Sequence, residues 1–395
     1  MPQVVRHINE TRVLGTLFRT GSMSRADLAR VLGLTRSTAG NLVSGLVQDG
    51  LVLEGQDQPA DQGSRTGRPG HHVRLNAHHA FFLGADIGIG RLTVVALDLA
   101  ADVVGHVSKS FNFNQADPEI VLNELVKLIR SVMAKLRASE AVQGLGVAVP
   151  GLLDHEGNVL RAPILGWSNV PILQVLHSKL PEIATIAAEN DANAFAVAEL
   201  YRAGSSAPAD VLYMVVDAGV GGGIVSKGTL FRGHGGYAGE IGHIFVGDNG
   251  FFELDTLPGS LESFVGREAI MARFRFHGGS GRTLEDFVEA LGLDAPAAAA
   301  TLADWSHYLG RGIATLTSVL NPQKIVLGGP VAILYKYAEE KVLVSVRRHL
   351  LSDHPLPEIE LSQLGADGPA VGAAAIMHRS MLALNEEFVF NGNQG

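Results

Sequence analysis

The sequence predicts an α/β protein with a small N-terminal helix-turn-helix head and a larger body of two related lobes. Apolar residues recur at helical spacing between residues 8 and 47, which is typical of a compact helical unit. Two glycine-punctuated strand pairs, at residues 81–99 and 211–231, repeat one pattern in the body. Residues 1–80 hold nine Arg, no Lys and six acidic residues, a net charge of +3, and the remainder carries −12. This division fits a DNA-binding head attached to a regulatory domain.

Composition excludes several classes of protein. At 395 residues the chain is long enough for two or three domains. It has no cysteine, which excludes disulfides and thiolate metal sites. The N-terminus has no apolar segment of the signal-peptide type, and no apolar run reaches about 18 residues. We therefore expect a cytoplasmic protein without a membrane partner.

Capping signals divide the head into three helices. Residues 8–20 form the first, and Ser24 to Asp27 is a capping box that begins the second. Gly33 ends the second helix, and Thr35 can cap the third. The third helix has one apolar stripe, made of Ala39, Leu42, Val43, Leu46 and Val47. Any three-helix packing unit could show this spacing, so the pattern alone leaves a non-DNA-binding bundle open.

The polar side of the third helix supplies the candidate base-reading residues. In a helix-turn-helix, the start of the second helix of the motif reads base edges. The residues expected there are Arg36, Ser37, Thr38 and Asn41. Residues 50–53 and 73–75 then predict two strands of a wing around a polar loop. Arg68, held extended by Pro69, suits insertion into a narrow minor groove, and a solvated loop is the alternative.

The body alternates strands and helices. We expect a strand hairpin at 81–99, a helix between Ile120 and Leu136, and a strand at 145–149. A second hairpin follows at 211–231, then a strand and turn at 324–329 and a closing helix at 370–384. Residues 391–395 should be a frayed tail.

The stretch from Gly235 to Glu262 carries the strongest site signal. Glu240 and His243 are three residues apart, so on one helical turn they share a face. Glycines around them let backbone approach whatever those side chains hold. A carboxylate and an imidazole in such a bend make a polyol-binding corner. The alternative is a tight loop with a satisfied Glu–His pair.

The residues GGYAGEIGH resemble the signature of the ROK family (repressor, open reading frame, kinase), which contains bacterial sugar kinases and sugar-responsive repressors. The head sequence SRADLARVLGLTRSTAG is similar to the winged head of the repressors, and NDANAFAVAE to the kinase motif that carries the catalytic Asp. The resemblance implies a two-lobed actin-like (sugar kinase/ribonuclease H-like) body. It divides the chain into a winged head at 1–76, a first lobe at 77–203 joined by a C-terminal helix at 369–388, and a second lobe at 204–368 with a sugar-site loop at 235–262.

The same resemblance implies the site residues. It places five polar residues around one sugar: Asn190, Asp191, Glu240, His243 and Glu262. Asp191 would be the general base in a kinase, because it would take the proton from the sugar hydroxyl. In an arbitrary protein, polar residues 190–193 at the start of a helix could be only a cap.

The phosphate loops and the zinc site depart from the family pattern. The first loop reads Asp86-Ile87-Gly88-Ile89-Gly90-Arg91, in which Ile89 stands for a Gly and Gly90 for a Thr. The second loop begins with Asp217 where the kinases have a Gly, which adds negative charge where phosphates would lie. The three family cysteines of the zinc site fall on Glu253, Asp255 and Ser260. We therefore predict no cofactor and no tightly bound zinc, with a weaker divalent site at Glu253, Asp255 and His243 left open.

These observations predict a non-catalytic, sugar-sensing transcriptional repressor of carbohydrate genes. Its partners would be operator DNA and a small sugar effector, and it would act as a homodimer or homotetramer. The alternative is a ROK kinase that phosphorylates a hexose or amino sugar with ATP, which the retained Asp191 favours. A constitutive regulator that binds no sugar is disfavoured, since all five polar positions survive.

Overall fold

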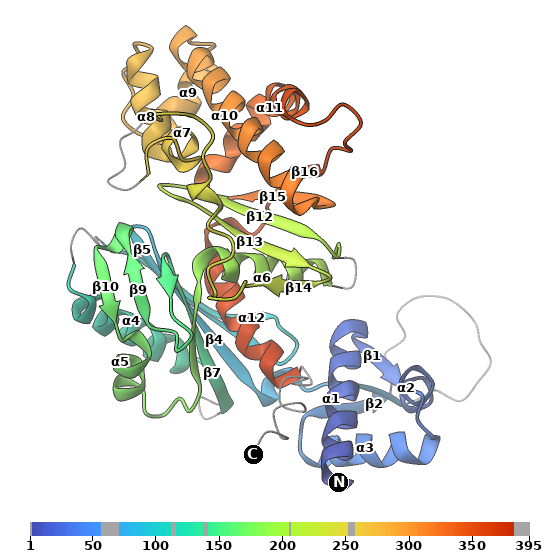
Figure 1. Ribbon diagram of the computed structural model, residues 1–395. Helices are drawn as coiled ribbons and strands as arrows, with labels where there is room; N and C mark the ends of the chain where they lie inside the picture. The colour runs from blue at the N-terminus through green and yellow to red at the C-terminus, as the bar shows by residue number, and fades with distance from the viewer. Residues whose placement is uncertain are drawn as a thin grey trace.

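The chain folds into a head and two lobes. The computed structural model describes residues 2–56, 71–111, 116–136, 141–204, 207–251 and 257–382. In Figure 1 the head lies beside the lower lobe, and the second lobe stands above the first. The predicted class, a winged head on a two-lobed α/β body, is confirmed.

The second and third helices of the head begin after their predicted caps, and the second ends at the predicted glycine. The first helix spans Pro2–Thr20, so it begins earlier than the predicted residues 8–20; the side chains of residues 4–7 are exposed and add no buried stripe to the sequence pattern. Ser24 Oγ accepts the backbone N–H of Asp27 at 3.1 Å, and Thr35 Oγ1 accepts that of Thr38 at 3.2 Å. Gly33 ends the second helix in the left-handed region at φ 68°. The Asp27 carboxylate accepts the Ser24 hydroxyl at 2.8 Å. The elements are α1 (Pro2–Thr20), β1 (Ser22–Ser24), α2 (Arg25–Leu32), α3 (Arg36–Gln48), β2 (Val52–Gln56) and β3 (His71–Leu75).

Antiparallel strands in the order β1-β3-β2 form the wing sheet, so the two predicted wing strands are confirmed. Arg25 fastens this sheet to α3, because its guanidinium binds both oxygens of Glu54 on β2 at 2.7 and 2.8 Å and the Ser44 hydroxyl at 3.1 Å. One residue of the predicted apolar stripe, Val47, is 37% exposed. It follows the buried Leu46 directly, so its side chain lies at the edge of the stripe and not on its buried face.

The first lobe is built on a mixed sheet in the order β11-β7-β4-β5-β6. Its first strand, β4, pairs antiparallel with β5 and parallel with β7. Its elements are η1 (Ala77–His79), β4 (Phe81–Gly88), β5 (Arg91–Asp98), β6 (Val103–Ser110), α4 (Pro118–Met133), β7 (Val142–Val149), β8 (Leu152–Leu153), β9 (Val159–Ala162), η3 (Pro163–Leu165), β10 (Trp167–Val170), α5 (Ile172–Lys179), β11 (Ile186–Asn190) and α6 (Asp191–Ala203).

The second lobe repeats this topology with the order β14-β13-β12-β15-β16. Its first strand, β12, again pairs antiparallel with the next strand and parallel with the later β15. The predicted repetition of the two hairpins is therefore a repetition of whole sheets. The elements are β12 (Val211–Val216), β13 (Val220–Ser226), β14 (Thr229–Phe231), η5 (Ile241–His243), α7 (Glu262–Val265), α8 (Arg267–Phe276), α9 (Leu284–Gly292), α10 (Pro296–Leu320), β15 (Lys324–Gly328), η6 (Pro330–Leu334), α11 (Tyr335–His349), β16 (Glu358–Leu361) and η7 (Gly365–Asp367).

The chain then returns to the first lobe as α12 (Gly368–Leu382), the predicted closing helix. Glycines let it approach closely. A Cβ on Gly372 would lie 1.7 Å from the carbonyl oxygen of Ala194 on α6, and one on Gly84 would lie 2.0 Å from that of Ala370. Because no side chain separates these backbones, α12 is pressed against both α6 and the sheet of the first lobe.

The head and the body share one apolar core. Head residues such as Leu17 and Leu46 belong to the same buried cluster as Phe82 on β4, Phe195 on α6 and Ala374 on α12. Separate clusters fill the rest of each lobe. Among the described residues, no helix is both long and apolar enough to cross a membrane.

Candidate functional site

The predicted cluster begins where β11 ends and α6 starts. Asn190 caps α6, since its side-chain oxygen accepts the backbone N–H groups of Ala192 at 2.9 Å and Asn193 at 3.1 Å. Its amide nitrogen donates to the carbonyl of Gly151 at 3.1 Å. The cap that Asn190 was expected to supply in an arbitrary protein is therefore present. It directs the first turn of α6, and with it Asp191, toward the space between the lobes.

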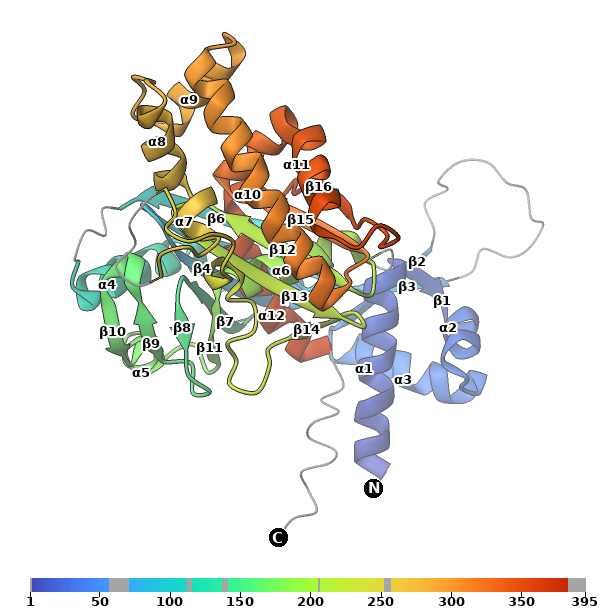
Figure 2. The ribbon, with the colours of Figure 1, turned by 45° about the horizontal axis from the view of Figure 1, so that its top comes forward.

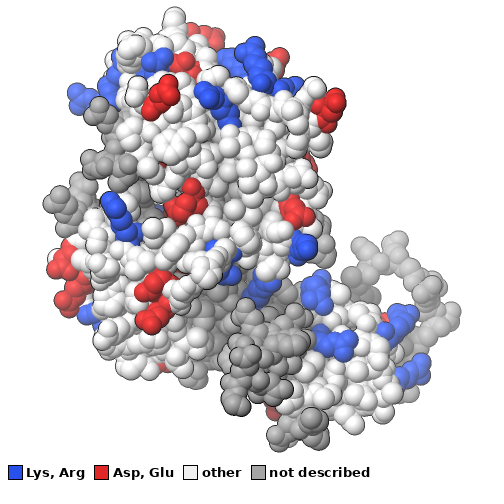
Figure 3. All heavy atoms as spheres, in the orientation of Figure 1, with Lys and Arg blue, Asp and Glu red and all other residues white. Residues whose placement is uncertain are grey.

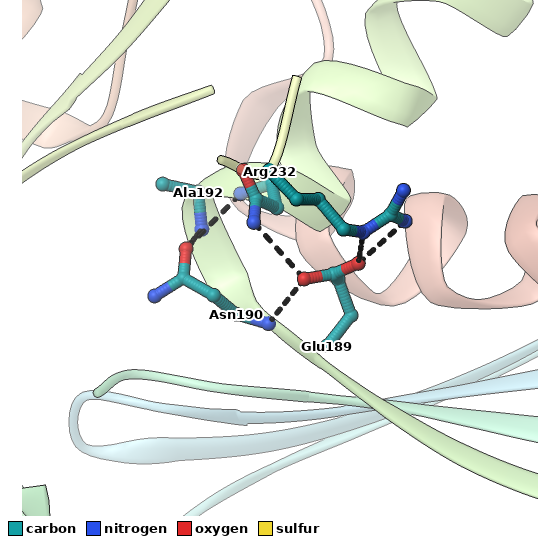
Figure 4. A network of polar contacts seen from close by, with 5 residues as sticks. Glu189, Asn190, Ala192 and Arg232 are labelled. Carbon is teal, nitrogen blue, oxygen red and sulfur yellow. Dashed lines mark hydrogen bonds and ion pairs between the residues drawn. The ribbon is translucent and has the colours of Figure 1, made fainter. Parts of the chain in front are cut away.

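A network around Glu189 holds this turn in place, and Figure 4 shows it from close by. One Glu189 oxygen accepts the backbone N–H of Asn190 at 3.1 Å and the side-chain amide of Asn193 at 3.0 Å. The other accepts Nε and Nη2 of Arg232 at 2.9 and 2.7 Å. Arg232 follows β14 in the second lobe, so this ion pair, in which two guanidinium nitrogens donate to one oxygen, joins the two lobes beside the candidate site.

Sequence reasoning missed both Glu189 and Arg232. The available signal was weak: an acidic residue directly before Asn190, and an arginine upstream of Glu240. Their pairing depends on two segments 43 residues apart meeting across the lobes.

Asp191 is the first residue of α6, and its surroundings favour the protonated form. Burial raises the pKa of Asp191 to about 6, and the nearby carboxylates of Glu240 and Asp217 act in the same direction. Its carboxylate accepts the backbone N–H of Ala192 at 2.9 Å. The Glu240 carboxylate is thus close enough to Asp191 to raise its pKa, although the two residues come from different lobes.

His243 lies between two carboxylates on the other side of the site. Its Nδ1 is 3.4 Å from Oε2 of Glu240, and its Nε2 is 3.5 Å from Oε1 of Glu262. Glu240 and His243 flank one helical turn, as their spacing predicts. Glu262, and to a smaller degree Glu240, raise the pKa of His243 above 6.5. These ion pairs are longer than ordinary hydrogen bonds, and both Glu240 and His243 are about 40% exposed, so the three groups keep capacity for a polar ligand.

The second phosphate loop is held by backbone and ionic contacts, although Oδ1 of Asp217 has no hydrogen-bond partner. Asp217 lies 3.4 Å from Nη1 of Arg267, and its backbone carbonyl accepts the Arg267 N–H at 2.7 Å. Glu262 Oε2 accepts the backbone N–H of Val220 at 3.4 Å. The backbone N–H of Val220 in this loop therefore faces a carboxylate.

The first phosphate loop is a tight hairpin turn between β4 and β5. Gly90 lies in the left-handed region at φ 73°, and Gly88 pairs with Arg91 across the turn. Arg91 is 3.4 Å from Oδ1 of Asp367 and donates to the carbonyl of Ala366, both in the segment before α12. Asp86 is only 3% exposed, one of its oxygens has no partner, and burial raises its pKa well above 3.8.

The loop that replaces the zinc site is only partly described. Glu253 and Asp255 lie outside the described residues. Ser260 is fully buried and bridges to Phe245, and the ring of Phe251 packs edge-on against Phe264 at 5.1 Å. Among the residues that the structure describes, no group of His, Asp and Glu is arranged to hold a metal ion. The absence of tightly bound zinc stays a prediction.

The head places its candidate base-reading residues on an open surface. Arg36, Ser37, Thr38 and Asn41 are all exposed on α3, opposite its buried side. Figure 3 shows several arginine side chains on the visible face of the head. Ser37 and Thr38 hydroxyls contact Thr35 Oγ1 at 3.0 and 2.8 Å, which fixes the first turn. Arg68, the predicted wing residue, lies outside the described residues.

Comparison with known proteins decides the family. The ROK family model matches residues 82–380, which is most of the chain. The chain belongs to the ROK family. The xylose repressor of Caldicellulosiruptor bescii is 26% identical over 97% of this chain and 98% of its own.

The glucokinase of Halalkalibacterium halodurans is 27% identical, but the match covers 74% of this ROK protein and 93% of the kinase. The crystal structure of a ROK family transcriptional regulator, a homolog of the Escherichia coli MLC protein, has a TM-score of 0.79 at 22% identity. It covers 96% of this chain and 97% of that one. At that identity the likeness establishes the fold alone, and it extends over both head and body.

Proposed function

We propose that this ROK protein is a transcriptional repressor whose release from operator DNA is controlled by a sugar bound between its lobes. One observation carries the proposal: a winged head with exposed polar residues on α3 is packed onto a body whose sugar-side residues remain available while its phosphate loops are engaged by the protein. The full-length likeness to a xylose repressor supports the same function.

The sugar site would be made of Asn190, Asp191, Glu240, His243 and Glu262. Carboxylates accept sugar hydroxyls in charge-assisted hydrogen bonds, each of which contributes about 1.5–3 kcal/mol. Asp191 comes from the first lobe and the Glu240–His243 turn from the second. A sugar held by both sets binds the closed arrangement better than the open one, and that difference is what shifts the equilibrium.

We propose that the protein does not catalyse phosphoryl transfer. That reaction depends on backbone donors and cations that neutralise the phosphates. Here Glu262 accepts the Val220 N–H, Asp217 adds negative charge, and Arg91 is directed to Asp367. The kinase alternative retains one argument, because a pKa of about 6 suits Asp191 as a general base near neutral pH.

The proposed domains are those of the family pattern: a head at 1–76, a first lobe at 77–203 completed by 369–388, and a second lobe at 204–368. In a homodimer or homotetramer, closure of the lobes would change the spacing of the heads. An operator with half-sites about one helical turn apart would then be released. We expect the coupling between sugar and operator to be about 1–3 kcal/mol.

The deciding experiment uses an operator fragment selected by the protein from random-sequence DNA. Release of this fragment is measured with D-xylose, D-glucose and N-acetyl-D-glucosamine, and ATP consumption is measured with the same sugars. The proposal expects release by at least one sugar and no ATP consumption. Sugar-dependent ATP consumption would establish the kinase alternative instead.

The DNA surface is tested with Arg36→Ala. Loss of an arginine contact to a base edge should weaken operator binding by about 1–3 kcal/mol and leave sugar binding by the body unchanged. Arg68→Ala should weaken binding most at sites with an A·T-rich flank. Arg275→Ala, an exposed arginine on α8, is the matched control. Equal operator affinity in all three variants would place the DNA surface elsewhere.

A further inference from the structure

The contact between the head and the body is an aromatic junction formed by three helices. Phe18 of α1 lies 5.0 Å from the ring of His378 on α12 and 5.8 Å from that of Tyr201 on α6, measured between ring centroids. His378 also meets Tyr201 edge-on at 5.7 Å and Phe82 of β4 at 4.9 Å. Figures 1 and 2 both show α1 beside the C-terminal end of α12. The ring of Phe18 thus touches both α6 and α12 of the body.

Hydrogen bonds fix the orientation of His378 within this junction. The ring is fully buried, and its Nε2 lies 3.0 Å from the carbonyl oxygen of Leu99. A carbonyl only accepts, so Nε2 carries the proton. In a neutral ring Nδ1 then accepts the hydroxyl of Tyr201, at 3.3 Å. Burial lowers the pKa of His378 below 6.5, in agreement with a neutral ring at physiological pH.

The helix that carries Tyr201 begins at the candidate sugar site. Asp191 is the first residue of α6, and Tyr201 lies in its last turns. An α-helix is stiff over such a length, so a displacement of its first turn is carried to its last. The first turn is also the part of α6 that Arg232 of the second lobe holds through Glu189. Movement between the lobes therefore acts on the end of α6 opposite the head.

Close packing leaves little room for α6 to move without changing the junction. Gly372 of α12 admits the backbone of Ala194 on α6, and residues of α1, α6 and α12 share one apolar cluster. Packed cores rearrange between discrete arrangements and do not deform continuously. A shift of α6 against α12 must be taken up where Tyr201, His378 and Phe18 meet.

We infer that the Phe18–Tyr201–His378 junction transmits the state of the sugar site to the DNA-binding head. The inference rests on the proposed function and adds to it the route by which the body acts on the head. In one arrangement Tyr201 donates to His378 and supports Phe18, which fixes the orientation of α1. When a sugar draws the lobes together, α6 moves, this support changes, and the head takes another orientation.

The test separates transmission from folding with Tyr201→Phe, which removes the hydroxyl and keeps the ring. Sugar affinity without DNA and operator affinity without sugar should both stay within about threefold of the wild type. The weakening of operator binding at saturating sugar should fall from the ordinary allosteric range, about 5- to 150-fold, to less than about threefold. Phe18→Leu should have the same effect, as an independent change on the other side of the junction.

Tyr213→Phe is the matched control. Tyr213 is also buried and meets α6 through the ring of Phe195 at 6.4 Å, but it lies on β12 of the second lobe. This control should keep the wild-type release. Thermal unfolding of each variant shows that the comparison is made between folded proteins.

Each outcome is decisive when D-xylose, D-glucose and N-acetyl-D-glucosamine are used as the probes. If sugar releases operator DNA from Tyr201→Phe and Phe18→Leu as it does from the wild type, the inference is wrong and the proposed function still stands. A parallel loss of sugar affinity and release also overturns it, because the junction would then be only structural. Absence of any response in the wild-type protein removes the proposed function, and the inference with it.

Discussion

The two sides of the space between the lobes use similar residues in opposite ways. On the sugar side, His243 stands between Glu240 and Glu262 at 3.4 and 3.5 Å, in long contacts that leave donors and acceptors available. On the phosphate side, hydrogen bonds to backbone fix the loops, while one oxygen each of Asp86 and Asp217 has no hydrogen-bond partner. The ion pairs there, Asp217–Arg267 and Arg91–Asp367, are equally long at 3.4 Å, but each has a backbone contact beside it: the Arg267 N–H donates to the carbonyl of Asp217 at 2.7 Å, and Arg91 donates to that of Ala366. One side is arranged to bind a ligand, whereas the other stabilises the fold.

The difference shows why counting retained motifs is not enough to assign an activity. Glu262 has a role on both sides, since one oxygen faces His243 and the other accepts the Val220 N–H. Arg91 ties the β4–β5 turn to the segment that leads into α12. Arg91 and the Val220 N–H would have to give up these contacts before they could hold a phosphate.

The largest expected effect comes from removing the carboxylates of the sugar side. Asp191→Ala and Glu240→Ala should each weaken sugar binding by about 2–3 kcal/mol, or roughly 30- to 150-fold, since each removes a charge-assisted acceptor. Both variants should keep operator binding and lose induction. Glu262→Ala should weaken sugar binding less if it contacts a single hydroxyl. Titration calorimetry and operator binding measure the two properties separately.

Asp217→Ala on the phosphate side is the matched control for this experiment. Its carboxylate faces Arg267, so sugar affinity should change by less than about threefold. Release of operator by Asp191→Ala at the wild-type sugar concentration would show that the effector binds elsewhere. Equal losses of sugar affinity in Asp191→Ala and Asp217→Ala would show that the sugar side and the phosphate side do not differ in their contribution to sugar binding.

An intermediate effect should follow from restoring the kinase residue to the first phosphate loop. Gly90→Thr should destabilise the protein by about 1–2 kcal/mol, because φ is 73° there and a β-branched side chain is strained in that region. It should not produce ATP consumption. Urea unfolding measures the loss of stability.

The control is Gly55→Thr on β2, which has open space around its Cα and an ordinary strand conformation. Threonine is favoured in strands, so this variant should be neutral or slightly stabilised. Equal stability of the two variants would show that the β4–β5 turn accepts the kinase residue. ATP consumption by Gly90→Thr would show that the engaged polar groups do not prevent phosphate binding.

The smallest effect concerns pH. The pKa of Asp191 is about 6, and a sugar hydroxyl donates best to the ionised carboxylate. Sugar binding should therefore release protons from Asp191. Affinity should be constant above pH 6 and fall by up to about tenfold per pH unit below it.

Asp191→Asn has no carboxyl group that titrates. This variant should bind sugar more weakly than the wild type, and its sugar affinity should not fall below pH 6. Calorimetry between pH 5 and pH 8 makes the comparison. If the sugar affinity of Asp191→Asn still fell below pH 6, the group that titrates would be a residue other than Asp191.

Local sequence determined the elements of this protein and much of the candidate site. Ser24, Gly33 and Thr35 set helix ends through contacts within a few residues, so their signals are complete in the sequence. Glu240 and His243 meet because three residues of chain turn them to one face. The repeated hairpins also predicted the duplicated sheets, since each hairpin is a local structure that begins its own sheet.

Only the tertiary structure decided how these parts act on one another. Glu189 and Arg232 meet across 43 residues, and Tyr201 and His378 across 177. No periodicity joins such positions, because their contact depends on how the lobes, α6 and α12 stack. On the phosphate side, the sequence shows which residues of the loops are altered. Only the fold shows that Asp217 pairs with Arg267 and that Arg91 pairs with Asp367. Short-range contacts are fixed by the chain itself, whereas long-range pairing is fixed by close packing of the whole core.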